Sequence, residues 1–148
     1  MSPRRGTDSA TTAREAALQM LYALDISGDD PGHILASYRS AHPLTPSAGA
    51  RAELLLRHAG IERQRIEDLI QRHSVGWRLE RMSVIDRNLL RLGTVEMLTG
   101  LAPSVAVQAT VRLARKFSQP EAISFIQGLL EAIARDLGTQ AEVAQHVL

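Results

Sequence analysis

The side chains best placed for chemistry in this sequence are two phenylalanines with cations close by. Phe117 directly follows Arg115 and Lys116, and Phe125 comes eight residues later, in the first turns of the next predicted helix. Rings that stack on bases, beside cations that bind phosphates, hold single-stranded nucleic acid in many proteins. The alternative is that both rings belong to the hydrophobic core, where phenylalanine is more often found. The residues alone favour this alternative.

Residues for catalysis or metal binding show no such arrangement. The five histidines form no HExxH motif and no other i, i+4 pair of histidines with a carboxylate ligand, so we expect no metal site. His58 and His73 would share a face of one predicted helix, but surface histidines are the simpler interpretation. There is no phosphate-binding GxxxxGKS/T loop, no GxGxxG turn after a strand, and no cysteine. We therefore expect no enzyme and no cofactor.

The composition is that of a globular chain with little net charge. Of the 148 residues 45% are hydrophobic, the formal net charge is +1, and the apolar runs are too short to span a membrane. The first residues lack the apolar stretch of a secretory signal and cysteine is absent, so we expect a cytoplasmic protein. All but one of the 17 basic residues are arginine. Arginine suits phosphate binding, although a GC-rich genome produces the same bias.

Apolar residues recur at helical spacing through the chain, and no stretch alternates as a strand would. The pattern predicts helices over residues 10–24, 33–40, 47–73, 83–100, 103–117 and 120–137, with a short one in the tail. Gly100 and Gly138 are predicted stops, and Ser83 with Asp86 has the spacing of a helix cap. We therefore predict an all-α fold, a compact bundle of about six to seven helices.

The predicted organisation is a short arm followed by one domain. Residues 1–9 are polar and contain Pro3 and Gly6, so we expect a flexible basic arm carrying Arg4 and Arg5. Residues 10–148 would form a single helical domain, with N-terminal helices to about residue 75 and C-terminal helices from about residue 80.

Gly128 interrupts the last long helix, in the stretch SFIQGLL. Glycine costs about 1 kcal/mol relative to alanine inside a helix. We therefore predict that Gly128 lets a neighbouring helix approach closely.

Several charged residues lie close together in the stretch RMSVIDRNLLR. It contains Asp86, Arg87 and Arg91. An amphipathic helix whose surface charges pair at i, i+4 would explain this composition. Arg87 and Arg91 are four residues apart and carry the same charge, however, so a contact surface for protein or nucleic acid remains open.

Three blocks of the sequence resemble the NusB family of transcription antitermination factors. They are AREAALQMLYALD, then WRLERMSVIDRNLLRLGTVEML, then APSVAVQATVRLARKFS followed by SFIQGLLEAI, and they match in order and spacing from about residue 12 to 137. The resemblance implies an all-helical, non-enzymatic RNA-binding protein. Family members pair with the small ribosomal protein NusE and bind the boxA element of nascent RNA. The resulting complex helps RNA polymerase to pass terminators in ribosomal RNA operons, and some members form homodimers.

The resemblance also implies which residues of this chain make contacts. RNA would bind to the first helix with its preceding arm, and to the junction of the two C-terminal helices. These regions contribute Arg4, Arg5, Arg14, Gln19, Tyr22, Lys116, Phe117, Phe125 and Gln127. The ribosomal protein would bind at the acidic position of the middle block, which is Asp86, with Arg87 and Arg91 alongside.

The chain departs from the family pattern in three places, so the resemblance is to a divergent member. Ser9 to Thr12 replaces an arginine cluster, Val107 to Thr110 replaces I-N-E-A and loses a carboxylate, and Gln127-Gly128 replaces N-G. Fewer phosphate contacts would weaken RNA binding and flatten its salt dependence.

Two alternatives to an antitermination factor follow from these departures and from the fold. One is a protein-interaction or dimerisation module of the same fold with weak or no RNA binding. The other is the related N-terminal domain of an rRNA methyltransferase. We expect the first rather than the second, since no glycine-rich cofactor-binding sequence follows before Leu148.

Overall fold

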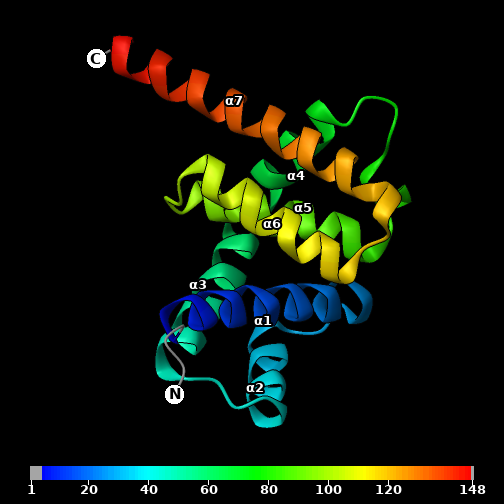
Figure 1. The fold of residues 1–148 in the computed structure, drawn as a ribbon, viewed down its shortest axis with the longest axis vertical. Helices are drawn as coiled ribbons and strands as arrows, with labels where there is room; N and C mark the ends of the chain where they lie inside the picture. Colours follow the sequence, from blue (N-terminus) through cyan, green and yellow to red (C-terminus); the bar gives the residue numbers. More distant parts are fainter. Residues whose placement is uncertain (1–4, 148) are drawn as a thin grey trace. The chain divides into compact units, whose positions relative to one another are not determined.

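The structure, a computed structural model, describes the backbone of residues 5–147 and the side chains of residues 9–140. This part contains seven α-helices, namely α1 (Arg5–Ser27), α2 (Pro31–Ala41), α3 (Pro46–Ile61), α4 (Arg63–His73), α5 (Val84–Leu98), α6 (Pro103–Phe117) and α7 (Ile123–Val147) (Figure 1). Two short 3₁₀ turns, η1 (Leu79–Arg81) and η2 (Pro120–Ala122), precede α5 and α7. Residues 5–147 contain no strand, so the predicted all-α class is confirmed.

The chain divides into two compact units. The first ends at Arg63 and contains α1, α2 and α3, and the second begins at Gln64 and contains α4 to α7. Helix α4 thus groups with α5, α6 and α7.

In the first unit, α1 packs against α2 and α3. Five of the six residues of the apolar stripe predicted for this helix are buried, namely Ala13, Ala16, Ala17, Met20 and Leu21, and the sixth, Leu24, is half-buried; Leu18 is also buried. Helix α3 contributes Ala52, Leu55 and Leu56 to the same core. Leu54 does not join them and is 37% exposed. The many alanines allow these helices to approach closely, since a methyl group fills little space between helix axes.

In the second unit, α5 packs against both α6 and α7 (Figure 1). Every residue of α5 from Asn88 to Met97 is buried except Arg91, so this helix has almost no exposed face. Of the stripe predicted for α6, Ala106, Ala109, Thr110, Leu113 and Ala114 are buried, and its last residue, Phe117, is half-buried. Helix α5 is thus the central helix of this unit, and it buries the polar side chains of Asn88, Thr94 and Glu96 along with its apolar ones.

The glycine that permits a close helix contact is Gly93 on α5. A Cβ atom there would lie 2.7 Å from Oγ1 of Thr110 on α6 and 3.0 Å from Cδ2 of Leu130 on α7. At Gly128 the prediction was wrong, because no heavy atom beyond the adjoining turns of its own helix lies within 4 Å of the position of its Cβ, and the residue is exposed. Among the described residues, no close contact with another helix therefore offsets the helix-weakening effect of Gly128.

Three helix boundaries differ from those predicted. Helix α1 begins at Arg5 rather than near residue 10. The single helix expected over residues 47–73 is broken at Glu62, which takes φ −96° and ψ 16° and donates its N–H to the His58 carbonyl. His58 and His73 therefore lie on different helices. Helix α7 continues through Gly138 to Val147 instead of stopping. A lone glycine without a cap only weakens a helix.

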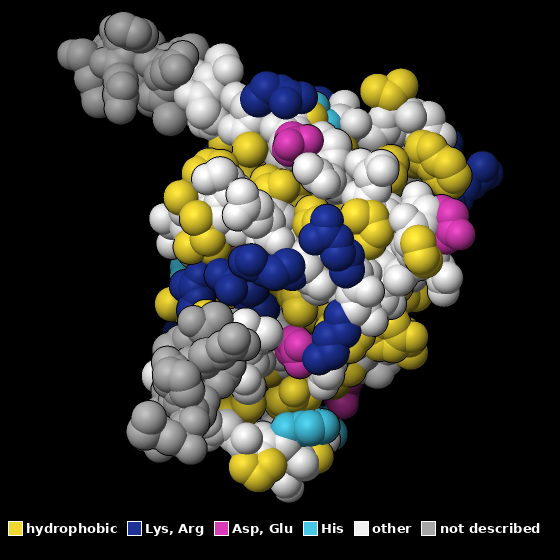
Figure 2. Space-filling view, in the orientation of Figure 1, with side chains coloured by type: hydrophobic (Ala, Val, Ile, Leu, Met, Phe, Trp, Pro, Cys, Tyr) yellow, Lys and Arg dark blue, Asp and Glu magenta, His cyan; other side chains and the backbone are white. Residues whose placement is uncertain are grey.

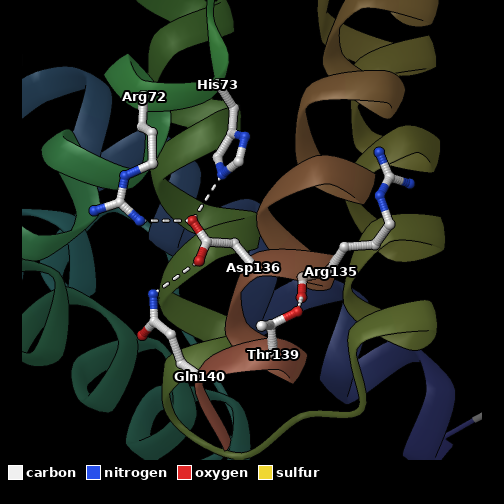
Figure 3. Close-up of polar contacts among 6 residues, drawn as sticks. All are labelled: Arg72, His73, Arg135, Asp136, Thr139 and Gln140. Atoms are coloured by element: carbon white, nitrogen blue, oxygen red, sulfur yellow. Dashed lines mark hydrogen bonds and ion pairs between the residues drawn. The ribbon is translucent and has the colours of Figure 1, made fainter. Parts of the chain in front are cut away.

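Helix α4 is tied to α7 by the carboxylate of Asp136, shown in Figure 3. Its Oδ2 accepts hydrogen bonds from Arg72 Nη1 at 2.7 Å and lies 2.8 Å from His73 Nε2. Its Oδ1 accepts from Gln140 Nε2 at 2.9 Å. Arg135, the residue before it, points away from this cluster. Three side chains, two from α4 and one from the next turn of α7, thus converge on one carboxylate.

We predict that acid weakens the link between α4 and α7, because protonation removes the negative charge of Asp136. Hydrogen bonds from His73, Gln140 and Arg72 lower the pKa of Asp136 from 3.8 to about 2. Because the pKa is lower in the folded state, the stabilisation from Asp136 is complete above the unfolded pKa and is lost as the pH falls through the folded value. We expect urea denaturation to show Asp136→Asn less stable than wild type at neutral pH, with the difference shrinking between about pH 4 and pH 2.

Asp68→Asn is the matched control for this experiment. Asp68 is an exposed carboxylate on α4 that accepts a hydrogen bond from Gln64 of the same helix, at 2.9 Å. Surface substitutions of this kind usually change stability by less than about 0.5 kcal/mol. A difference between wild type and Asp136→Asn that stayed constant down to pH 2 would contradict the assigned role of the carboxylate.

Candidate nucleic-acid and partner interface

The first predicted group of contact residues lies on α1. Gln19 and Tyr22 are exposed and three residues apart, and Ile26 continues the same face one turn later with 60% exposure. Arg14 is half-buried. Arg4 and the side chain of Arg5 lie outside the described residues. The structure therefore provides a polar and aromatic face on α1. Of the predicted arm, residues 5–9 belong to α1, and residues 1–4 lie outside the described part of the chain.

The second predicted group lies where α6 ends and α7 begins. Lys116 is exposed, and its Nζ lies 5.3 Å from the centroid of the Phe117 ring. Ser118 caps α6, with its N–H donating to the Ala114 carbonyl at 2.7 Å. Gln127 is exposed on the second turn of α7. A cation beside an aromatic ring at a helix end can bind a phosphate while the ring contacts another part of the same ligand.

Neither phenylalanine is a fully buried core residue. Both Phe117 and Phe125 are half-buried, whereas their neighbours Ala114 and Ile126 are completely buried. The ring of Phe125 packs against that of Trp77, with the centroids 6.1 Å apart and the planes tilted by 56°. Both residues are therefore partly covered by the protein and partly exposed.

The predicted partner residues lie on α5 and are already engaged within the protein to different degrees. Asp86 is half-buried, and its Oδ1 accepts a hydrogen bond from the Ser118 hydroxyl at the end of α6. The predicted cap is present, since Ser83 Oγ accepts from the Asp86 N–H at 3.1 Å. Asp86 thus joins the beginning of α5 to the α6–α7 junction, the segment Phe117–Ile123. It brings the predicted protein-contact position beside part of the predicted RNA-contact group.

Arg91 has a structural partner that the sequence pattern did not indicate. Its guanidinium Nη2 lies 3.1 Å from Glu67 Oε1 on α4, and its Nη1 donates to Asn88 Oδ1 at 3.1 Å. The Arg91 side chain is only 19% exposed. Arg87 is half-buried on the next turn toward the N-terminus. Arg91 therefore holds α4 against α5, and a contact with a partner protein remains a prediction for all three residues.

The departures from the family pattern fall at different depths in the structure. Ala109, where a carboxylate is missing, is 3% exposed, so this change alters the core of the second unit. Ser9 to Thr12 lies at the start of α1, with Ser9 Oγ 2.8 Å from Ser47 Oγ on α3 and the other three residues exposed. Only this second departure removes charge from an exposed surface.

The surface shows the side-chain types that an interface needs. On the face drawn in Figure 2, basic side chains (dark blue) and hydrophobic side chains (yellow) are exposed next to one another, and acidic ones (magenta) are more scattered. Within the described residues no three His, Asp or Glu side chains are placed to hold a metal ion. None of the described helices is long and apolar enough to cross a membrane. The exposed aromatic, amide and cationic side chains of this surface can bind a ligand by stacking, hydrogen bonds and charge.

Fold and surface together define an all-α protein of two small helical units that exposes aromatic rings and cations where helices end. The model of the NusB family matches residues 11–135. The chain belongs to the NusB family.

Relatives in several bacteria support this assignment. A protein of Sorangium cellulosum named transcription antitermination protein NusB is 34% identical over 130 residues, which cover 86% of this chain and 93% of that one. The protein of the same name from Streptomyces coelicolor is 40% identical over 125 residues, covering 80% and 87%. The family resemblance inferred from the sequence is thereby confirmed.

Solved structures show the same fold. Thermotoga maritima NusB superposes with a TM-score of 0.78 and 27% identity, covering 91% of this chain and 92% of that one. A crystal structure of antitermination factors NusB and NusE in complex with dsRNA contains a chain that matches with a TM-score of 0.80 and 26% identity, covering 87% and 98%.

Several residues of this surface escaped the sequence analysis as individual sites. Trp77 entered it only as the first letter of a matching block, and Ser118 did not enter as a contact at all. A signal for Trp77 was present, since it is the only tryptophan of the chain and follows a glycine in a polar stretch. The Asp86–Ser118 contact had no signal, because it joins residues 32 positions apart in the sequence.

Proposed function

We propose that this chain is a transcription antitermination factor that binds boxA-like single-stranded RNA together with the ribosomal protein NusE. The observation that carries the proposal is the α6–α7 junction, where Lys116 lies over the ring of Phe117 and the nearby Phe125 keeps part of its ring exposed. The match to a NusB chain solved with NusE and RNA supports the same partners. Through them the protein would join the RNA polymerase complex on ribosomal RNA operons in the cytoplasm.

Binding alone accounts for this role, and we propose that the protein is not an enzyme. RNA would be held by Arg4, Arg5, Arg14, Gln19, Tyr22, Lys116, Phe117, Phe125 and Gln127. Bases of a single strand are free to stack on protein rings, whereas bases in a duplex are already stacked on one another. Partly exposed phenylalanines therefore favour single-stranded over double-stranded RNA as the ligand of this chain.

The ribosomal protein would bind beside the beginning of α5. We propose Asp86 and Arg87 as direct contacts and Arg91 as a residue that supports them, because Arg91 is already paired with Glu67 at 3.1 Å. The Asp86–Ser118 hydrogen bond gives this surface a physical connection to the α6–α7 junction. A partner at α5 would thereby favour one arrangement of the RNA-binding residues, which predicts tighter RNA binding when NusE is present.

Fluorescence anisotropy of a labelled boxA-like RNA tests the proposal. We expect binding that NusE strengthens and that weakens with salt between about 50 and 200 mM. A duplex of the same sequence should compete poorly. The absence of binding both with and without NusE would reject the RNA role.

Lys116→Gln gives this experiment a matched variant. Each phosphate contact to a single strand contributes about 0.7 to the slope of log affinity against log salt concentration, so the slope should decrease by about that amount. Arg57→Gln is the control, because Arg57 is already paired with Glu53 of its own helix at 2.8 Å. Equal slopes for wild type and Lys116→Gln would show that Lys116 does not contact a phosphate of the RNA.

A second candidate function is a protein-interaction or dimerisation module with little RNA affinity. It is favoured by the uncharged start of α1, where Thr11 and Thr12 are exposed at the place of the family's arginines. This function predicts stable binding of NusE or a homodimer in sedimentation experiments, and no NusE-dependent retention of RNA.

A further inference from the structure

Trp77 is displayed on the surface although it is the largest side chain of the protein. It is 56% exposed and lies in the segment between α4 and η1, where Val75 is 88% exposed. Tryptophan is highly buried on average, because its ring contributes a large apolar area to a core or an interface. An exposed indole that does not serve the core is a candidate for contact with a ligand.

The backbone of Trp77 is held in place by a compact hydrogen-bond network. Its N–H donates to the Ser74 carbonyl at 2.9 Å, and its own carbonyl accepts from Gln71 Nε2 at 2.8 Å and from Ser74 Oγ at 3.0 Å. Gln71 Oε1 also accepts the Leu79 N–H at 3.1 Å. Gly76 has φ +81°, a conformation that other residues adopt only with strain. These contacts thus fix the backbone around Trp77, while its indole ring is exposed on the surface.

The geometry of the ring pair leaves aromatic surface uncovered. Trp77 and Phe125 meet at 56° with centroids 6.1 Å apart, so the two ring faces do not lie on each other. By contrast, Tyr38 and His42 stack at 4.3 Å and 18°, an arrangement in which each ring covers a face of the other. A flat ligand can therefore reach a face of the indole beside Phe125.

The surroundings of this ring pair suit a nucleotide better than an apolar peptide. Arg78 follows Trp77 directly, has a side chain 74% exposed, and is only loosely paired with Glu80 at 3.7 Å. Gly128 lies three residues after Phe125 on α7, with open space where its Cβ would be. A base can stack on the indole while its phosphate approaches an exposed guanidinium, which is how aromatic and cationic side chains share one nucleotide.

We propose that Trp77 is an RNA-binding residue whose indole stacks on a base of the single strand next to the position of Phe125. The inference rests on the proposed function and extends it to the α4–η1 segment. Because the backbone is already fixed, the ring loses little freedom on binding, and such preorganisation increases affinity. The site accepts any base, since stacking uses the flat face that all bases share.

The intrinsic fluorescence of wild-type protein tests the proposal without any substitution. Trp77 is the only tryptophan, so its emission can be excited apart from tyrosine and reports on this one ring. We expect quenching by boxA-like RNA that saturates at the same concentration as the anisotropy change of the labelled RNA. Wild type that binds RNA with unchanged tryptophan emission would overturn the stacking contact.

Variants then measure how much the ring contributes. We expect Trp77→Ala to bind RNA about 5- to 100-fold more weakly, with Trp77→Phe recovering part of the loss. Val75→Ala is the matched control, because it truncates a still more exposed apolar side chain of the same segment and should bind as wild type. Thermal denaturation of each variant confirms that the folded state is retained.

The remaining outcomes separate this inference from the proposed function. If wild type binds no RNA with or without NusE, both are rejected. If wild type binds RNA and Trp77→Ala binds equally well, only the role of Trp77 is rejected. If Trp77→Ala lowers NusE binding in the absence of RNA and leaves RNA affinity intact, the ring is a protein contact and the inference is overturned.

Discussion

Gly93→Ala is expected to destabilise the protein by about 2 kcal/mol, because overpacking of a dense core typically costs 1–3 kcal/mol. The added methyl group would lie 2.7 Å from Thr110 Oγ1 and within 3.1 Å of both Leu130 methyl groups. Thr110 and Leu130 are completely buried, and Thr110 Oγ1 already donates to the Ala106 carbonyl at 2.8 Å. Because both neighbours are buried, we expect neither to move aside without disturbing the packing around it. Alanine regains about 1 kcal/mol of helix propensity, which we expect to be smaller than the clash.

Urea denaturation of Gly93→Ala and Gly128→Ala measures this difference with an internal control. At Gly128 no heavy atom beyond the adjoining turns of the same helix lies within 4 Å of the added carbon, so only the gain in helix propensity remains. We expect Gly128→Ala to be about 1 kcal/mol more stable than wild type. The two substitutions are chemically identical and should change the free energy of unfolding in opposite directions. A stabilised Gly93→Ala would show that α5, α6 and α7 are less closely packed than described.

Phe125→Ala should reduce RNA affinity by about 5- to 100-fold, since a base stacked on an aromatic ring contributes about 1–3 kcal/mol. The ring is half-buried, so truncation also removes part of its packing against Trp77. We expect that loss of stability to be smaller than for a buried side chain. Anisotropy with boxA-like RNA and urea denaturation, measured on the same preparation, distinguish the two effects.

Ile126→Ala is the matched control for Phe125→Ala. Ile126 is the next residue of α7 and is completely buried. Replacing a buried isoleucine by alanine costs about 2–5 kcal/mol, so this variant should lose stability while its folded fraction still binds RNA. If Phe125→Ala loses as much stability as Ile126→Ala and the folded protein binds RNA normally, the ring belongs to the core.

Much of the fold could be predicted because helical periodicity is local. The buried faces of α1 and α6 follow from the spacing of Ala13, Met20, Ala106 and Leu113, and each is confirmed. The cap at Ser83 depends on residues three positions apart and is also present, at 3.1 Å. Two predicted boundaries were wrong, since the break at Glu62 was missed and the stop at Gly138 is absent. Helix ends are marked only weakly by the residues around them.

The candidate site was only partly predictable. Phe117, Phe125 and Lys116 could be selected from residue type and spacing, and their exposure in the structure is compatible with contact to a ligand. Whether a ring lies in the core or at the surface depends on which helix covers it, and that information is not local. Trp77 illustrates this, since only the fold brings it to Phe125.

By itself the sequence determined that this protein is a helical member of the NusB family, which faces of its helices are buried, and which residue types are available for RNA. Tertiary structure alone decided that Gly93 rather than Gly128 is the close contact, that Arg91 binds Glu67, and that Asp136 receives Arg72 and His73. The reason is physical. Periodicity specifies a buried face, but the partner of that face is set by packing between residues such as His73 and Asp136, which are 63 positions apart.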